Sequence, residues 1–146
     1  MGKEIGGRSH VASGALWFKK NDYSSEKVSC EDKVIFGESY SLSYDTLFKL
    51  EKQANKVKKT PVFSFGYDKY QENFVLVQSN CYNKYEPDTY LQKIVKNKSI
   101  KLNYLDIKAL VVPHVVMAEY IFEEYNKKYI LMTWQDFVDN ITDFYI

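Results

Sequence analysis

Residues 39–50 of the chain are SYSLSYDTLFKL, and residues 99–110 are SIKLNYLDIKAL. In both stretches a serine, a leucine and a tyrosine stand at the same spacing, ahead of apolar residues that recur every three or four positions. That spacing is typical of an amphipathic helix with a capped start. Each helical pattern leads to a proline, Pro61 or Pro113, and then to two strand-like runs. The sequence therefore predicts two similar αββ units in one compact domain.

The first unit has a clear pattern along its whole length. A helix is expected over 43–58, with Ser41 or Ser43 as its cap. Two alternating apolar segments, 61–67 and 73–78, flank a polar turn and predict a hairpin. The apolar stripe of the helix consists of Tyr44, Leu47, Leu50, Ala54 and Val57.

The second unit, residues 79–146, is expected to repeat this arrangement. A short helix is predicted over 87–97, where Pro87 suits a first helical turn. Strands are predicted over 113–122 and 128–133, and a closing helix over 134–141. No segment with the composition of a domain linker separates this unit from residues 15–78, and residues 1–14, rich in Gly and Ser, predict a loop or arm.

Residues 26–36 predict a strand with two unlike faces. Alternation places Val28, Cys30, Val34 and Phe36 on one face and Lys27, Ser29, Glu31 and Lys33 on the other. Asp32 is an exception, because it falls on the apolar face.

The composition of the chain indicates a globular protein and shows no feature of a membrane or secreted protein. The chain has 146 residues, 45% hydrophobic and 27% charged, with a net charge of +1, which is typical of a globular domain. No apolar run approaches the ~18 residues of a membrane span, and the N-terminus lacks the apolar segment of a signal peptide. We therefore expect a cytoplasmic protein without a membrane partner.

The few cysteines and histidines restrict the metals that the chain could bind. Cys30, Cys81, His10 and His114 show neither CxxC nor HxxxH spacing, which excludes the usual structural zinc sites. Any metal must be held mainly by carboxylates, which favours hard cations such as Mg²⁺, Mn²⁺ or Ca²⁺.

Two triplets combine a carboxylate and a lysine two positions apart: 31–33 (EDK) and 106–108 (DIK). Residues i and i+2 share a face in a strand but diverge in a helix, so only the first triplet brings the two groups together. Asp22 lies just before that strand. With Glu31 it could hold a divalent cation, with a further ligand from the backbone carbonyl of Asp32, while Lys33 orients a water. The alternative is an ordinary solvated pair between Glu31 and Lys33.

The run SGALWFKKND (13–22), followed by EDK (31–33) and SYSL (39–42), resembles the PD-(D/E)xK nuclease superfamily. More narrowly, it is similar to the phage-encoded and archaeal-type Holliday junction resolvases. The resemblance implies an α/β fold, a restriction-endonuclease-like mixed β-sheet flanked by helices, with residues 15–78 as its catalytic core. It also implies Mg²⁺- or Mn²⁺-dependent hydrolysis of DNA phosphodiesters, selectivity for branched DNA, and a homodimer, in the host cytoplasm if the protein is phage-encoded.

The same resemblance assigns roles to particular residues. Asp22 and Glu31 would be metal ligands, Lys33 the catalytic lysine, and Ser13 the loop serine near the scissile phosphate. Asp32 occupies a position that is usually apolar in the family. Asp32, together with the lack of room for the family's first helix before Gly6, favours an alternative: a non-catalytic DNA- or protein-binding module on the same scaffold.

Basic residues near the predicted site are candidate phosphate contacts. They are Arg8, Lys19 and Lys20 before the strand, and Lys49 and Lys52 on the helix that follows it. Phosphate contacts would make DNA binding strongly salt-dependent. The alternative is a solvated face without a binding role, and the near-neutral net charge also allows a phage or mobile-element interaction protein with no nucleic-acid role.

Overall fold

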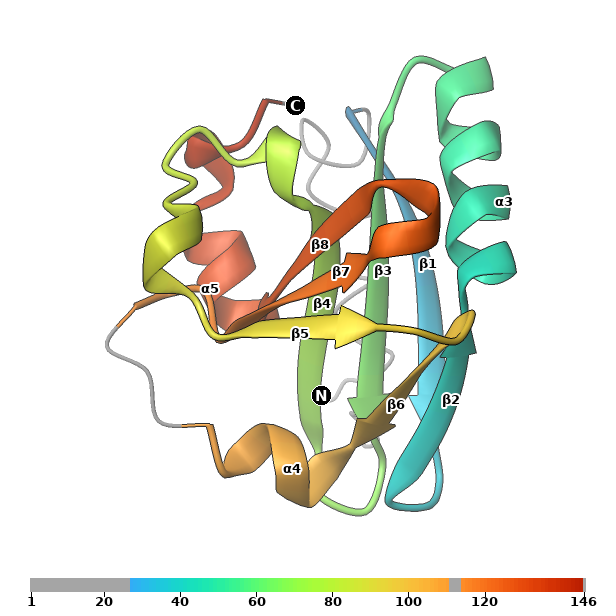
Figure 1. Ribbon diagram of the computed structural model, residues 1–146, viewed down its shortest axis with the longest axis vertical. Coiled ribbons are helices and arrows are strands. Elements are labelled where there is room, and N and C mark those ends of the chain that lie inside the picture. The colour runs from blue at the N-terminus through green and yellow to red at the C-terminus, as the bar shows by residue number, and fades with distance from the viewer. Residues whose placement is uncertain (1–26, 111–113, 146) are drawn as a thin grey trace, which may run out of the picture.

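Strand pairing divides the computed structural model, which describes residues 27–110 and 114–145, into a six-stranded mixed sheet and a two-stranded ribbon (Figure 1). The strands are β1 (Val28–Ile35), β2 (Ser39–Ser43), β3 (Thr60–Tyr67), β4 (Glu72–Gln78), β5 (Gln92–Val95), β6 (Ser99–Asn103), β7 (Ala118–Phe122) and β8 (Lys127–Thr133). The helices are α3 (Tyr44–Lys56), α4 (Tyr104–Lys108) and α5 (Trp134–Asp139). Short 3₁₀ turns occupy Ser79–Cys81, Pro87–Thr89, Glu123–Tyr125 and Ile141–Asp143.

The large sheet has a symmetric strand order, β1-β3-β4-β8-β7-β5. The outer pairs, β1 with β3 and β5 with β7, are parallel, whereas the hairpins β3–β4 and β7–β8 and the central pair β4–β8 are antiparallel. A rotation about the centre of the β4–β8 pair therefore exchanges two ββαββ halves, β1-β2-α3-β3-β4 and β5-β6-α4-β7-β8. This repeat includes the predicted αββ units and extends each by two strands.

The ribbon joins the two halves, because β2 of the first pairs with β6 of the second. At its two ends the backbone amides bond reciprocally: Tyr44 N–H donates to the carbonyl of Lys98 at 2.6 Å, and Tyr104 N–H donates to that of Glu38 at 2.8 Å. The repeated motif of residues 39–44 and 99–104 thus forms a strand exchanged between halves, followed by the start of a helix.

Each half repeats one aromatic contact. The Tyr44 ring stacks on Tyr125 with centroids 4.0 Å apart, and the Tyr104 ring stacks on Tyr70 at 3.7 Å. Tyr70 and Tyr125 end the matching hairpin turns, and the next residue in each, Gln71 or Asn126, has a positive φ of 53°. Each tyrosine that begins a helix therefore packs on the hairpin of the opposite half.

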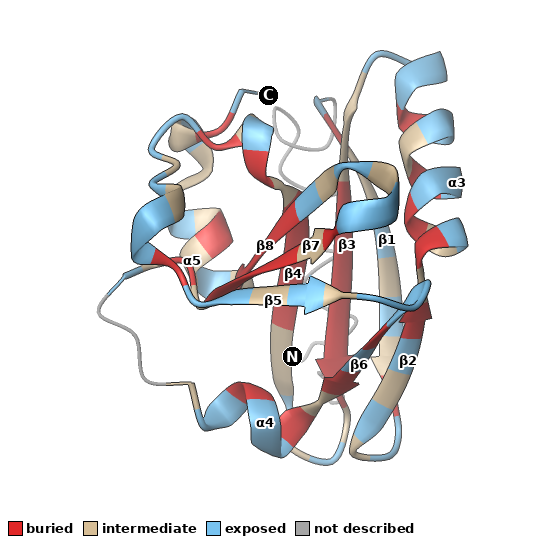
Figure 2. Ribbon diagram, viewed as in Figure 1, coloured by how far each residue is buried: buried red, intermediate tan, exposed pale blue. Residues whose placement is uncertain are grey.

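Two apolar cores lie on the two faces of the sheet. Figure 2 shows the buried positions along the strands and on the inner side of α3. One core lies under α3 and the ribbon and contains the aromatic side chains of β3, β4 and β7; the other lies against α5. The inner strands β3 and β4 are buried on both faces over most of their length, which explains their largely apolar sequence.

Several predicted elements are confirmed by the structure. The helix expected over 43–58 is α3, capped by the Ser43 hydroxyl, which accepts from the Thr46 N–H at 3.3 Å. The predicted hairpin is β3–β4, and the strand expected over 26–36 is β1. A mixed sheet with helices, the broad fold class, is likewise present. No helix within the described ranges is long and apolar enough to cross a membrane.

Other predictions were wrong at particular residues. The helix expected over 87–97 is a 3₁₀ turn at Pro87–Thr89 followed by β5, because Gln92–Val95 pairs with β7. The closing helix is α5, which ends at Asp139. Phe36 and Val57 fall outside their expected elements and are 77% and 59% exposed. In β5, pairing with β7 prevailed over the local helical pattern.

Leu42 and Leu102 test the exchange of strands between the halves. Both side chains are fully buried on the ribbon, so Leu42→Ala and Leu102→Ala are each expected to cost about 2–5 kcal/mol of unfolding free energy. Urea denaturation of either variant should still show one transition, because neither half retains its ribbon without the other. Leu105→Ala, at a 58% exposed position, is the control and should change stability by less than about 0.5 kcal/mol. Two separate transitions would contradict the interdependence of the halves.

Candidate active site

Glu31 and Lys33 lie on the same side of β1, as the strand prediction required. Both side chains are exposed, and their register partners in β3, Phe63 and Phe65, belong to the core under α3. The Lys33 Nζ stands 5.0 Å from the centre of the Tyr40 ring on β2. The carboxylate and the ammonium therefore project into solvent on the α3 side of the sheet.

Asp32 lies on the opposite face of β1, where the sequence placed it among apolar residues. Its carboxylate Oδ1 accepts a hydrogen bond of 2.7 Å from the buried Ser64 hydroxyl on the adjacent strand. Burial raises the pKa of Asp32, and the Ser64 hydrogen bond partly opposes that rise. The Asp32 carboxylate thus does not join Glu31, and any metal contact from this residue would have to come from its backbone carbonyl.

Five of the predicted site residues lie outside the described ranges: Arg8, Ser13, Lys19, Lys20 and Asp22. Within those ranges no group of three or more His, Cys, Asp or Glu side chains comes together as a metal site. Glu31 supplies one hard oxygen ligand of the kind that Mg²⁺ prefers. A divalent cation would need further ligands beside Glu31, and the sequence assigns that role to Asp22.

The lysines of α3 form a row on the outside of the helix. Lys49, Lys52 and Lys56 are exposed, three and four positions apart, opposite the buried stripe that packs against β3 and β1. The Lys52 Nζ also stands 5.5 Å from the Phe48 ring. α3 and the side chains of Glu31 and Lys33 are on the same side of the sheet, and the lysine row lies on the face of α3 that is turned away from the sheet.

The second half holds a counterpart of the triplet that the sequence did not reveal. In the parallel pair β5–β7, Lys93 is opposite Tyr120, just as Lys33 is opposite Phe65 in β1–β3. Leu91 then corresponds to Glu31, and Gln92 corresponds to Asp32. The lysine is kept in the second half, but the carboxylate that would bind a cation is replaced by leucine.

A buried carboxylate occupies the position that matches Ser64. Glu119 is fully buried and accepts hydrogen bonds from the Ser79 hydroxyl at 2.6 Å, from the Gln92 amide at 3.3 Å and from the Tyr85 hydroxyl. Burial and this carboxylate raise the pKa of Tyr85, so its hydroxyl remains a donor. Glu119 thereby ties the segment between β4 and β5 to β7. Sequence pattern gave no sign of this cluster, because its members come from separate segments.

Asp32 gives a pH-dependent test of this geometry. Because its pKa is higher in the fold than in the unfolded chain, its protonated form stabilises the fold below the ordinary Asp pKa of about 3.9, and this contribution is lost as the pH rises through the raised value. Asp32→Asn keeps an oxygen that can accept from Ser64, so the variant should melt higher than wild type at pH 7. The difference should vanish below about pH 4.

Glu31→Gln is the matched control, since it removes a charge from an exposed position on the same strand. Thermal melts of both variants between acid and neutral pH provide the measurement. A lower melting temperature for Asp32→Asn at pH 7 would show that the hydrogen bond to the charged form outweighs the cost of burying it.

Comparison with known proteins identified no relative of this chain. No protein-family model, curated protein or solved structure matches the chain. The function of the Glu31–Lys33 side of the sheet has to be inferred from its own chemistry and from the resemblance in its motifs.

Proposed function

We propose that the protein is a divalent-metal-dependent DNA endonuclease whose site comprises Asp22, Glu31 and Lys33. The observation that carries this proposal is the placement of Glu31 and Lys33 together, exposed on one side of an edge strand of the sheet. A Glu-x-Lys pair needs this strand geometry to act on a single phosphate. In the helical triplet that ends at Lys108, the same spacing separates the two groups.

The roles of the residues follow from their charges. Glu31 and Asp22 would hold the Mg²⁺ or Mn²⁺, which, when bound, would lower the pKa of a water and offset charge on the phosphate. Lys33 is positioned to orient the attacking water and to stabilise the negative charge that develops on the phosphate oxygens. Its site next to the Tyr40 ring restricts where the ammonium can reach.

Exposed lysines on α3 support DNA as the substrate. Lys49, Lys52 and Lys56 lie on the same side of the sheet as Glu31, so one duplex arm could contact both. The preference for branched DNA and the homodimer are proposed from the resemblance to junction resolvases. A symmetric dimer would present two sites to the two symmetry-related strands of a four-way junction.

A second candidate function is a DNA-binding module without catalysis. Asp32 favours this function, because its carboxylate bonds to Ser64 on the opposite face of the sheet. Glu31 is then the one acidic side chain of the triplet on the same face as Lys33. In that case the lysines of α3 would still bind phosphates, and Glu31 would serve only as a solvated partner of nearby cations.

Cleavage assays distinguish these functions. In Mg²⁺ or Mn²⁺ the wild type should cut a synthetic four-way junction faster than a matched duplex. Asp22→Asn and Glu31→Gln should each lower cleavage about 100-fold or more, because the ligands that hold the cation are lost. Lys33→Ala should also cut more slowly while still binding Mn²⁺.

Asp106→Asn is the matched control, since it alters the Asp-x-Lys triplet of α4, where the two side chains diverge. Its cleavage should equal that of wild type. A wild type that binds the junction but does not cut it with either metal would refute the endonuclease and leave the binding module.

Salt dependence tests the lysine row separately. Lys49→Ala with Lys52→Ala should weaken junction binding and flatten the slope of log K against log salt by up to about two, which is roughly one for each lost phosphate contact. Lys128→Ala, an exposed lysine on β8, is the control. Equal affinity and slope in the double variant and wild type would show that the α3 lysines only solvate the helix.

A further inference from the structure

The two halves differ most in the length of their helices. α3 has 13 residues and packs against β3 and β1, whereas α4 has five residues and packs chiefly against β6. Figure 1 shows α3 alongside β1 and β3, while α4 lies at the end of β6 and below β5. In the first half, α3 covers one face of β1 and β3. No described helix covers the corresponding face of β5 and β7 in the same way, because α4 is too short.

A cavity of about 210 Å³ opens at that place, between β5, β6 and α4. Its apolar wall is formed by Ile100, Ile107, Leu110 and Tyr120. Leu110 is the counterpart of Leu50 in the repeat. α3 continues beyond Leu50, whereas α4 ends at Lys108, before Leu110. A cavity of this size can take one large apolar side chain, since an engineered protein cavity of roughly 150 Å³ holds benzene.

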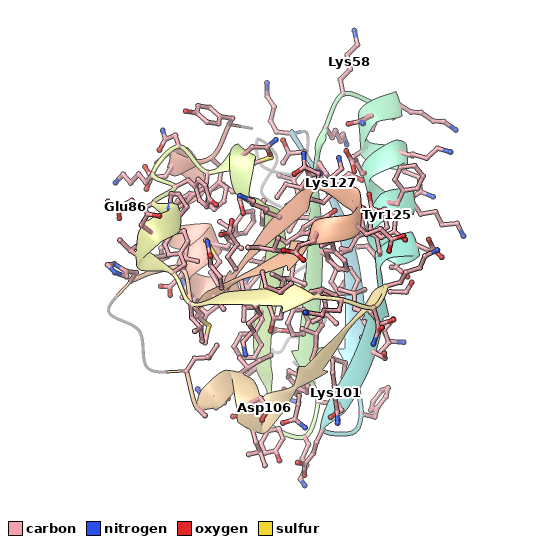
Figure 3. The ribbon with its side chains drawn as sticks, in the orientation of Figure 1. Lys58, Glu86, Lys101, Asp106, Tyr125 and Lys127 are labelled. Carbon is pink, nitrogen blue, oxygen red and sulfur yellow. The ribbon has the colours of Figure 1, made fainter. Side chains whose placement is uncertain are left out.

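The rim of the cavity is positively charged. Lys93, Lys96 and Lys101 line it, and Asp106 is the one acidic residue among its lining groups (Figure 3 labels Lys101 and Asp106). None of these three lysines forms an ion pair with another described residue. Ile94, also in the lining, is 43% exposed and extends the apolar surface outward.

Tyr120, which lines the cavity, carries a hydroxyl that is neutral at physiological pH. Burial and the nearby Asp106 raise the pKa of Tyr120 to about 12. The cavity lining therefore combines apolar side chains with polar atoms and three lysines, which differs from an all-polar phosphate site.

We propose that this cavity binds an acidic amphipathic helix of a partner protein, which inserts one large apolar side chain between β5 and α4. Three features select this occupant. The matching face of the first half is covered by a helix, apolar side chains form part of the cavity lining, and the lysines of the lining complement carboxylates that flank the inserted side chain. The proposal does not depend on nuclease activity, because Lys93 and its neighbours belong to the half that lacks a counterpart of Glu31.

The test uses a helical peptide of about 16 residues as the probe, with Leu and Phe on one face and Glu on the other. Added to the full-length ¹⁵N-labelled protein, it should shift the amide signals of residues 93–101 and 106–110. A peptide with Lys in place of Glu, and another with Ala in place of Leu and Phe, should each bind at least about tenfold more weakly.

Variants then locate the contact. Lys93→Glu with Lys101→Glu should weaken binding of the acidic peptide by at least about tenfold, and Lys128→Glu, a charge reversal on β8, should not. The ¹⁵N spectra of both variants would show that they fold. No binding of the acidic peptide, or binding that the double variant leaves unchanged, would overturn the proposal. It would also be overturned if the apolar-face Ala peptide, inorganic phosphate or duplex DNA shifted the same signals as strongly, since the lysines would then form a general anion surface.

Discussion

The antiparallel ribbon of β2 and β6 is the constraint on which the rest of the fold depends. Each of its strands belongs to one half of the repeat and pairs only with the other, so the ladder cannot form within a single half. The helices α3 and α4 begin where the ribbon ends, and their first amides bond across it to Lys98 and Glu38. The positions of α3 and α4, and with them the two cores, follow from a pairing that links residues far apart in the chain.

Two ion pairs join the halves, and the acidic partner belongs to the strand in one pair and to the helix in the other. Glu72, the first residue of β4, forms a 2.9 Å ion pair with Lys108 of α4, whereas Lys127, the first residue of β8, forms a 3.0 Å ion pair with Glu51 of α3. Two copies of the first half would bring Glu72 toward an α3 that carries Glu51. Partly exposed pairs of this kind add little stability, but like charges in their place would disfavour the wrong pairing. The reversal therefore favours the union of unlike halves in one chain over the pairing of like halves.

The sequence predicted those elements whose pattern is local. Period-two alternation found β1 and the exposure of Glu31 and Lys33, and the stripe from Tyr44 to Ala54 found α3. The repeat was visible in the residues that form the ribbon, because the same serine, leucine and tyrosine positions serve the same contacts twice. β5 was missed because its four residues become a strand only through pairing with β7. The Glu119 cluster was missed because four separate segments contribute to it.

Asp32 departs from the apolar pattern of its face of β1. In the sequence it conflicts with its apolar face, and in the fold the conflict is resolved by one hydroxyl, that of Ser64, on the neighbouring strand. Its counterpart pair in the second half, Gln92 with Glu119, places the carboxylate on the inner strand instead. Both halves thus place one hydrogen-bonded polar pair at the same point of the parallel ladder, with the buried member, Ser64 or Glu119, on the inner strand and the acidic member on opposite strands.

Lys33 and Lys93 occupy the same position of the repeat but have different surroundings. In the first half Lys33 retains an acidic neighbour on its face, Glu31, and lies on the side of the sheet that a long lysine-bearing helix covers. In the second half Lys93 faces a cavity beside a short helix, and its acidic neighbour has become Leu91. A cation and a phosphate suit the first arrangement, whereas an apolar group with flanking carboxylates suits the second. The two surfaces therefore differ in the chemistry they offer although their strands correspond, and both proposed binding roles rest on that difference.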